Sequence, residues 1–241
     1  MTAPAVPRAT YRLQFSAGFT FDQAADLAPY LEALGVSHVY ASPFLKARAG
    51  STHGYDITDH AQINPEIGDA AALDRKEAAL QERGIGLILD FVPNHMGVGG
   101  NDNPWWLDVL EWGPASPFAP FFDIDWDVLR GKVLLPFLGD HYGMVLERGE
   151  LQARFDAERG AFSVWYHSHR FPIAVHHYAR LLKRVRERAG ESGLALDALI
   201  AGFAGLGSGA KSVLGLSTVH RQAEPAVGRR RSNWPTSWFS A

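Results

Sequence analysis

The sequence contains no cysteine and no long apolar run. Without cysteine, the chain can form neither a disulfide nor a cysteine-ligated zinc site. Because no stretch of 18 apolar residues is present, we expect no membrane-spanning helix and no membrane partner. The N-terminus lacks the apolar segment that follows a basic start in secretory signals, so we expect a cytoplasmic protein.

An excess of basic charge is also missing. The 241 residues include 23 Lys and Arg against 26 Asp and Glu, a net charge of −3, which argues against a nucleic-acid partner. The hydrophobic content of 46% is that of a globular protein and well above that of a disordered chain. The length allows one large domain or two small ones, and it is close to the ~250 residues of a complete (β/α)8 barrel.

Composition changes toward the C-terminus. Residues 198–241 contain one acidic residue, Glu224, and five basic ones, and Gly, Ser and Ala become frequent there. The three arginines at 229–231 are either a patch for an anionic partner or part of a solvated tail, and short charge runs are usually tails. We expect residues 202–241 to be disordered, or to be out of frame with the rest of the chain.

Three segments predict β-strands, and two segments between them predict helices. Alternating or β-branched residues favour strands over 9–15, 36–41 and 85–92. Apolar residues at helical spacing favour helices over 23–34 and 69–83. Strand, helix, strand, helix, strand is the pattern of an α/β fold. We therefore predict the first three βα units of an incomplete (β/α)8 TIM barrel.

Three details of this prediction concern single elements. Thr20 or Asp22 is expected to cap the first helix. Residues 44–68 contain several glycines and prolines at turn positions and are expected to form a long loop. The almost continuously apolar IGLILDFV (85–92) is typical of a strand that is buried on both faces, as in a parallel sheet.

The α/β rhythm stops after Val92. Residues 93–171 are rich in Trp, Pro and Gly, and they predict an inserted loop-rich subdomain after strand 3. Helices are expected over 173–191 and 194–203. We therefore divide the chain into barrel residues 1–95, an inserted subdomain B over 96–172, a helical segment over 173–201 and an atypical tail over 202–241.

Seven aromatic residues crowd the insertion, namely Trp105, Trp106, Trp112, Phe118, Phe121, Phe122 and Trp126. Most of them are expected to form the core of the insertion. One or two are expected to be exposed, where a flat ring can stack on a glucan.

The segment DFVPNH (90–95) carries the strongest local signal for a binding site. Asp90 ends the third predicted strand, and Asn94 and His95 follow in the loop. A carboxylate, an amide and an imidazole at one rim of a sheet can all hydrogen-bond sugar hydroxyls. Alternatively, Asp90 caps the loop backbone and His95 is a packed structural residue.

A second candidate lies in the loop after the second predicted strand, where His53, Tyr55 and Asp56 occur together. Because it follows a strand, it is expected at the same rim as Asp90. The ring of Tyr55 can stack on a pyranose while the carboxylate of Asp56 accepts hydroxyl protons. The alternative is an ordinary turn with solvated charges.

Metal and phosphate sites are not predicted. The acidic residues at 123, 125 and 127 resemble the start of a calcium loop, but Val128 and Leu134 occupy the positions that need Gly and Glu. The histidine pairs at 167 and 169 and at 176 and 177 lack a third ligand at a sensible spacing. No phosphate-binding glycine motif follows a strand, so we expect no cofactor.

These motifs resemble the α-amylase superfamily, glycoside hydrolase family 13. DFVPNH looks like its first conserved region, and HGYDITDHAQINPEIG (53–68) looks like its second-loop element. The more specific similarity is to the family of maltooligosyl trehalose synthases. It is dense over about residues 9–140, and it is carried by ATYRLQF (9–15), YASPFLKARAGSTHGYD (40–56), NPWWLDVLEWGPASPFAPFFDIDW (103–126) and LPFLG (135–139).

The resemblance implies a catalytic (β/α)8 barrel with an insertion after the third strand. It also implies an isomerase reaction on a maltooligosaccharide, in which the reducing-end α-1,4 bond becomes an α,α-1,1 (trehalose) linkage by retaining intramolecular transglycosylation. The implied substrate-binding residues are His53, Tyr55, Asp56, Asp90, Asn94 and His95.

Individual roles follow from the same resemblance. Tyr55 is expected to stack on the sugar that precedes the scissile bond, and Asp56 and His95 are expected to hydrogen-bond that sugar. Asp90 and Asn94 are expected to shape the loop that holds His95.

The sequence departs from this family in its catalytic carboxylates. The family's nucleophile follows an apolar fourth strand in the pattern R-x-D, and Arg154-Phe-Asp156 does not follow such a strand. We expect none of the three catalytic carboxylates in this chain, a truncated product, poor solubility and no activity of the chain alone. The alternatives are a non-catalytic glucan-binding fragment and another family 13 amylase or α-glucosidase.

Overall fold

The computed structural model describes residues 6–156, 158–189 and 196–205. The chain divides into two compact units, with the sequence boundary between Asn103 and Pro104, and each unit is described by itself. The division of the chain at residues 95, 172 and 201 stays a prediction. Most of the expected disordered tail lies outside the described residues, but residues 202–204 belong to helix α6 (Asp197–Ala204).

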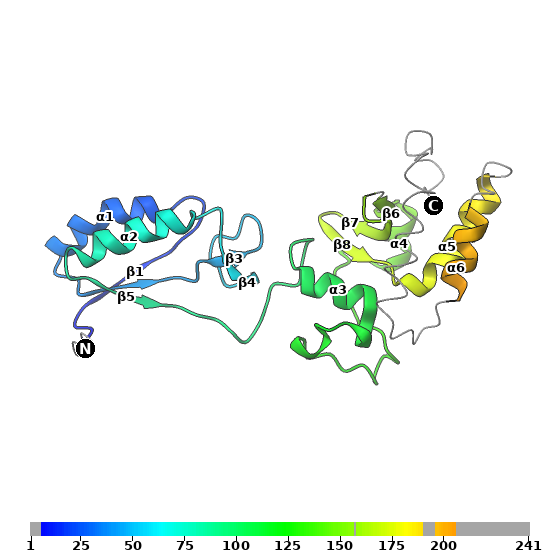
Figure 1. Ribbon diagram of the computed structural model, residues 1–241, viewed down its shortest axis with the longest axis horizontal. Helices are drawn as coiled ribbons and strands as arrows, with labels where there is room; N and C mark the ends of the chain where they lie inside the picture. The colour runs from blue at the N-terminus through cyan, green and yellow to red at the C-terminus, as the bar shows by residue number, and fades with distance from the viewer. Residues whose placement is uncertain (1–5, 157, 190–195, 206–241) are drawn as a thin grey trace. The chain divides into compact units, whose positions relative to one another are not determined.

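A parallel three-stranded sheet forms the centre of the first unit. Its strands lie in the order β1 (Thr10–Leu13), β2 (His38–Ala41) and β5 (Gly86–Leu89). Helices α1 (Phe21–Ala33) and α2 (Ala70–Gln81) lie along one side of the sheet (Figure 1). This arrangement confirms the predicted α/β fold. The first unit contains the three predicted parallel strands and the two helices between them, and within the described residues the sheet does not close into a barrel.

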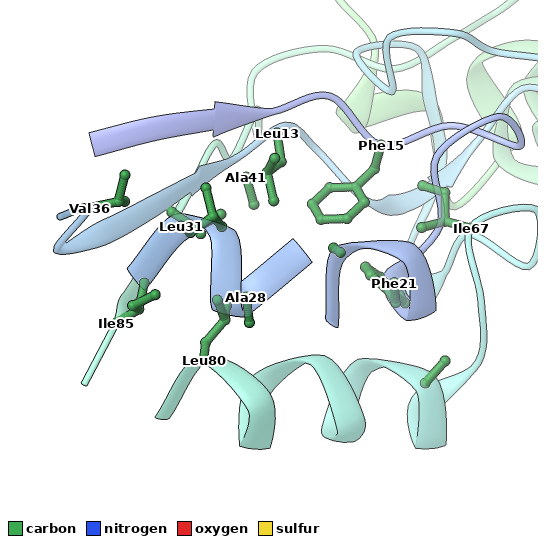
Figure 2. Packing of buried hydrophobic residues seen from close by; sticks show 13 residues of the cluster. Leu13, Phe15, Phe21, Ala28, Leu31, Val36, Ala41, Ile67, Leu80 and Ile85 are labelled. Atoms are coloured by element: carbon green, nitrogen blue, oxygen red, sulfur yellow. The ribbon is translucent and has the colours of Figure 1, made fainter. Parts of the chain in front are cut away.

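The core of this unit lies between the sheet and the two helices. Side chains alternate across a strand, and those of Leu13, Val39 and Ala41 point toward the helices with at most 4% of their surface exposed. Figure 2 shows Phe15 and Phe21 in the same layer, with ring centroids 5.2 Å apart. Burying each large apolar side chain contributes about 1.5–3 kcal/mol.

Side-chain caps fix where both helices begin. The Thr20 side chain accepts a hydrogen bond from the Gln23 amide at 3.4 Å, and the Gln23 side chain accepts one from the Thr20 amide at 2.8 Å. Thr20 is therefore the cap, and Asp22 is not. Asp69 caps α2 by accepting a hydrogen bond from the Ala72 amide at 2.8 Å. Such caps satisfy amides that the first helical turn leaves without partners.

The prediction of a loop over residues 44–68 is wrong in part. Strands β3 (Leu45–Ala47) and β4 (Ile57–Ile63) pair there as an antiparallel ribbon with two register shifts. The β-branched pair Ile57 and Thr58 is buried at the start of β4. The glycines and prolines that suggested a loop lie between and after these strands, so turn residues concealed two short strands.

The prediction that the third parallel strand is buried on both faces is also wrong. Residues 87 and 88 are half-buried, and Leu89 is 55% exposed. Just beyond the strand, Phe91 is 59% exposed. Within the described residues β5 pairs only with β2, so its other edge and part of its apolar surface are open.

The second unit begins with short helices. Helix α3 (Pro104–Trp112) is followed by two 3-10 turns, η1 (Gly113–Ala115) and η2 (Ala119–Phe121), and later by α4 (Tyr142–Glu147). A proline lies in the first turn of each 3-10 helix. Proline donates no backbone hydrogen bond and disfavours helical geometry in the residue before it, which is consistent with the shortness of these elements.

The aromatic residues of this segment divide as the sequence suggests. Trp106 lies in the local core and is 8% exposed. Trp105 packs against Phe118 and Phe121, with ring centroids 5.0 and 4.8 Å away, while Phe121 itself is 64% exposed. Most of the set therefore builds a small core.

An antiparallel sheet and two helices complete the second unit. The sheet order is β6 (Leu151–Asp156), β7 (Ala161–Tyr166) and β8 (His169–Pro172). The helix predicted over 173–191 begins later, with the 3-10 turn η3 (Val175–His177) and then α5 (Tyr178–Ala189); residues 190 and 191 are outside the described range. Helix α6 packs against α5.

In the parts of the chain that the structure describes, no helix has the length and apolarity to cross a membrane.

A buried lysine lies in the core of the first unit. Lys76 on α2 is fully buried, and its Nζ atom has no hydrogen-bond partner among the described residues. The rings of Phe15, Phe21 and Phe44 surround it at 5.6, 5.1 and 5.1 Å. Burial lowers the pKa of Lys76 to about 8, and Glu77 opposes this weakly. Cation–π attraction offsets only part of the cost of removing the ammonium group from water.

We expect Lys76→Met to raise the free energy of unfolding of the first unit by about 1–2 kcal/mol at pH 7, because it removes a buried charge without a polar partner. The pKa of Lys76 is lower in the folded than in the unfolded chain, so the wild-type protein gains stability as pH rises from about 8 to about 10.4. The advantage of the variant should therefore shrink near pH 10. Urea unfolding, with the hydrogen exchange of residues 6–103 as its readout, measures both effects.

Lys46→Met is the matched control, because the Lys46 amine keeps a polar contact with Gln62 at 3.4 Å. It should change stability little at pH 7. If Lys76→Met instead lowers stability at pH 7, the three aromatic rings hold the charged amine more strongly than its desolvation costs.

The open edge of β5 predicts self-association. Exposed apolar residues beside an unpaired strand edge favour pairing between chains. Leu89→Lys should therefore increase the fraction of monomer, because a charge at an edge opposes such pairing. Size-exclusion chromatography with light scattering at several protein concentrations measures this. A wild-type chain that is monomeric throughout would contradict the prediction.

Candidate functional site

Polar side chains gather where the three parallel strands end. Arg12 on β1 is in register with Tyr40 on β2, and Tyr40 is in register with Ile88 on β5. Asp90 follows two residues after Ile88, and its amide donates a hydrogen bond to the Ala41 carbonyl at 2.9 Å. Because side chains alternate along strands, Arg12, Tyr40 and Asp90 share the face that points away from the helices.

Asp90 is the centre of this group. Its Oδ2 atom accepts hydrogen bonds from the Tyr55 hydroxyl and from Arg12 Nη1, the latter at 3.1 Å. Arg12 Nη2 also donates to the Tyr55 hydroxyl at 2.9 Å, and the guanidinium lies 5.0 Å from the centre of the Tyr40 ring. The Asp90 side chain is only 14% exposed, whereas that of Arg12 is 38% exposed.

The protonation equilibria of these residues are coupled. The hydrogen bond from Tyr55, together with Arg12 and Tyr40, holds the pKa of Asp90 below its usual value of 3.8. The Asp90 carboxylate in turn raises the pKa of Tyr40. The carboxylate is therefore ionised at neutral pH and engaged by donors of its own chain, which suits a structural role better than that of a nucleophile.

The backbone of the Tyr55 loop is held by the Gln14 side chain and by a hydrogen bond within the loop. Gln14 Nε2 donates to the carbonyl oxygens of Thr52 and His53 at 3.3 and 3.1 Å. The Tyr55 amide donates to His53 Nδ1 at 3.1 Å. Gly54 has φ +77°, and a Cβ there would overlap the Pro43 carbonyl oxygen, so only glycine allows this turn.

Asp56 makes local contacts. Its Oδ1 atom accepts a hydrogen bond from the Ser51 hydroxyl at 2.5 Å and lies 3.9 Å from His53 Nδ1. The side chain of Asp56 is 25% exposed and that of His53 is 53% exposed. Both stay accessible, so their predicted contact with a sugar is compatible with this geometry.

His95 reaches the same loop from the segment after β5. Its Nε2 atom lies 2.9 Å from the Tyr55 carbonyl oxygen, and its side chain is exposed. Asn94 is exposed beside it. The structure thus brings Tyr55, Asp90 and His95 together at one rim. The roles of all the predicted substrate-binding residues in sugar recognition stay predictions.

The Arg48 side chain packs against the segment that follows His95. Its side chain lies so close to Gly97 and Gly99 that a Cβ atom at either position would come within 3.1 Å of it. The Gly97 amide donates to the Ile57 carbonyl at 2.8 Å, which ties this segment to β4. These contacts fix the segment without occupying the side chains of the predicted site.

Sequence reasoning missed Arg12 and Tyr40. Both lie inside strands, and their apolar neighbours in sequence supported a purely structural interpretation. A signal was nevertheless present, because Arg12 places a charge in the middle of ATYRLQF. A charged side chain of a strand needs a polar partner when it is covered by the protein. Register with β2 and β5 supplied the missing information.

Two acidic residues that the sequence singles out, Asp125 of the calcium-like segment and Asp156 of Arg154-Phe-Asp156, accept hydrogen bonds from backbone amides. Asp125 Oδ1 accepts hydrogen bonds from the amides of Asp127 and Val128, both at 3.1 Å, so it caps a turn. Asp156 likewise accepts from the Glu158 amide at 3.0 Å and ends an antiparallel strand. Over the described ranges, no group of three or more His, Asp or Glu side chains is arranged to hold a metal ion.

Comparison with known proteins shows what part of the chain is similar to. Residues 24–125 match the family model of the α-amylase catalytic domain. A protein of Mycobacterium tuberculosis named as a maltooligosyl trehalose synthase is 52% identical over 136 residues, which are 54% of this chain and 18% of that protein. An intracellular maltogenic amylase of Bacillus subtilis is 36% identical over 99 residues, 41% of this chain and 16% of the amylase.

A solved structure gives the same result. The maltooligosyltrehalose synthase of Arthrobacter ramosus aligns with a TM-score of 0.62 and 43% identity, over 70% of this chain and 21% of that one. The predicted resemblance to the N-terminal part of the maltooligosyl trehalose synthases is therefore confirmed. The chain spans about a fifth of the length of the relatives that it matches.

Asp90→Asn tests the centre of the site. It should lower the free energy of unfolding of the first unit by about 1 kcal/mol at pH 7, because it removes a charged hydrogen-bond acceptor. The pKa of Asp90 is lowered on folding, so this contribution is present above about pH 4 and is lost as pH falls through the folded-state pKa. Urea unfolding near pH 7 and near pH 2, followed by hydrogen exchange of residues 6–103, measures the difference.

Asp22→Asn is the control, because Asp22 also pairs with an arginine but its side chain is 59% exposed. It should cost less at pH 7, since exposed pairs contribute little. An equal cost of Asp90→Asn at both pH values would show that the charge of Asp90 plays no part.

Proposed function

We propose that the first unit supplies one side of a glucan site of the maltooligosyl trehalose synthase type. The reaction is the conversion of the reducing-end α-1,4 bond of a maltooligosaccharide to an α,α-1,1 linkage by intramolecular transglycosylation. The observation that carries this proposal is the 52% identity to a protein of that name, together with the meeting of Tyr55, Asp90 and His95 at one rim.

In this proposal the six predicted residues bind sugar or support those that do. Tyr55 offers its ring, which is fixed through its hydroxyl group. Asp56 and His95 keep accessible polar atoms for sugar hydroxyls, with His53 and Asn94 beside them. Asp90 holds Tyr55 in place, because its carboxylate already accepts two donors from this chain.

Catalysis by this chain alone is not part of the proposal. Retaining transfer between sugars uses two carboxylates about 5–5.5 Å apart, one as nucleophile and one as acid and base. Among the described residues, Asp90 is the carboxylate that directly follows a strand of the parallel sheet, and it is engaged by Tyr55 and Arg12. We therefore propose substrate binding without turnover.

The alternative of a family 13 hydrolase has less support. The maltogenic amylase match has lower identity and covers less of this chain than the match to the synthase-named protein. A glucan-binding protein without any catalytic partner is the other alternative, and it predicts the same contacts with sugar. The predicted cytoplasmic location stays a prediction.

Titration with maltopentaose tests the binding part of the proposal. Heteronuclear NMR should show chemical-shift changes centred on residues 52–56 and 90–96. Tyr55→Ala should weaken binding about tenfold, because a lost aromatic contact of roughly 1–1.5 kcal/mol corresponds to that factor. Tyr30→Ala is the matched control, since Tyr30 is 54% exposed on α1 and has no assigned role. Equal binding by both variants would contradict the proposal.

Reconstitution separates the enzymatic alternatives. The chain alone should leave the reducing ends of maltopentaose unchanged. It should form a non-reducing product when mixed with a polypeptide of the Mycobacterium tuberculosis relative that lacks the matched 136 residues. Release of shorter sugars with free reducing ends would favour a hydrolase, and turnover by the chain alone would contradict the expected inactivity.

A further inference from the structure

One charged residue lies within the parallel strands. Among the residues of β1, β2 and β5, Arg12 is the single Lys, Arg, Asp or Glu side chain. Charged groups are uncommon in such strands, and this one is only 38% exposed. A partly covered charge at this position is stable only when polar groups of the chain pair with it.

The fork of the Arg12 guanidinium joins two parts of the site. Nη1 donates to Asp90 Oδ2 at 3.1 Å, on the segment that follows β5. Nη2 donates to the Tyr55 hydroxyl at 2.9 Å and to Gln14 Oε1 at 3.2 Å. The planar group also lies over the Tyr40 ring. Lysine has the same charge but lacks this fixed pair of donor directions.

These contacts hold Tyr55 at its ring end and at its backbone. The hydroxyl group is held directly by Arg12 and Asp90. The backbone is held through Gln14, whose amide group donates to the carbonyls of Thr52 and His53 while its oxygen accepts from Arg12. Arg12 thus contacts three of the side chains that fix this loop, those of Gln14, Tyr55 and Asp90.

We propose that Arg12 is a positioning residue that sets the orientation of the Tyr55 ring for stacking on a glucose unit. It acts through the Tyr55 hydroxyl, Asp90 and Gln14, and it does not itself touch the sugar. This inference rests on the proposed function and deepens it, because it identifies what prepares the stacking surface before substrate arrives.

A simpler role for Arg12 would be to neutralise Asp90. That role requires only a positive charge, so Arg12→Lys would preserve it. Positioning requires the fork, so Arg12→Lys should disturb Tyr55 nearly as much as Arg12→Met does. The two roles therefore predict different behaviour for the conservative variant.

The first measurement needs no sugar. Tyrosine labelled with 13C at the ring carbon that bears the hydroxyl reports hydrogen bonding at each tyrosine, and Tyr55→Phe identifies the Tyr55 signal. We expect Arg12→Lys and Arg12→Met to shift this signal, with signals from the second unit unchanged. Arg75→Lys is the matched control, because Arg75 donates twice to Asp22 at 2.9 and 3.0 Å on the surface.

The second measurement is the affinity for maltopentaose. Arg12→Lys and Tyr55→Phe should each weaken binding about five- to tenfold, and the double variant should be little weaker than either single one, because both remove the same constraint. Circular dichroism and hydrogen exchange establish that each variant is folded. If Arg12→Lys does not fold, Tyr55→Phe and Gln14→Leu carry the same test with Arg12 intact.

The outcomes separate the two proposals. The positioning role would be overturned by an Arg12→Lys variant whose Tyr55 signal does not shift and whose maltopentaose affinity stays within about twofold of the wild type. Additive losses in the double variant would also overturn it. If the wild-type chain binds no maltopentaose, the proposed function fails, and the Tyr55 signal alone still decides whether Arg12 positions the ring.

Discussion

The shared hydrogen bonds among Arg12, Tyr55 and Asp90 connect three parts of the first unit that are far apart in sequence. Arg12 belongs to β1, Asp90 follows β5, and Tyr55 lies between β3 and β4. Each of these segments is short, and the ribbon of β3 and β4 has an irregular register. The polar link therefore fixes the Tyr55 loop against the sheet at a place where regular strand pairing does not reach.

The two faces of the parallel sheet have different roles, one in the core and one in the candidate site. One face packs against α1 and α2 and is built from fully apolar side chains such as Val39 and Ala41. The other carries Arg12 and Tyr40 in register and leads to Asp90. A strand alternates its side chains, so successive residues of the same short strands serve the core and the candidate site in turn. In barrels the loops at the carboxyl ends of strands build the active-site face, and the polar group lies at that end.

The order of the elements could be predicted from sequence because the relevant signals are local. Helical spacing, the Thr20 cap and the apolar strands all act within a few residues. The β3–β4 ribbon was missed because pairing between Leu45 and Ile63 depends on contacts across a loop. The exposure of Leu89 was missed for a related reason. An apolar strand shows how much surface it could bury, but its burial depends on which strands pair with it.

For the candidate site, the sequence by itself determined that Tyr55, Asp90 and His95 belong to segments with sugar-binding chemistry, because their motifs resemble known ones. It also established that Asp90 lies at a strand end. Only the tertiary structure decided that Asp90 supports Tyr55, and that Arg12 joins them. The reason is register: a strand's sequence gives the alternation of its side chains, but the neighbouring strand with which each side chain meets is fixed only when the sheet forms.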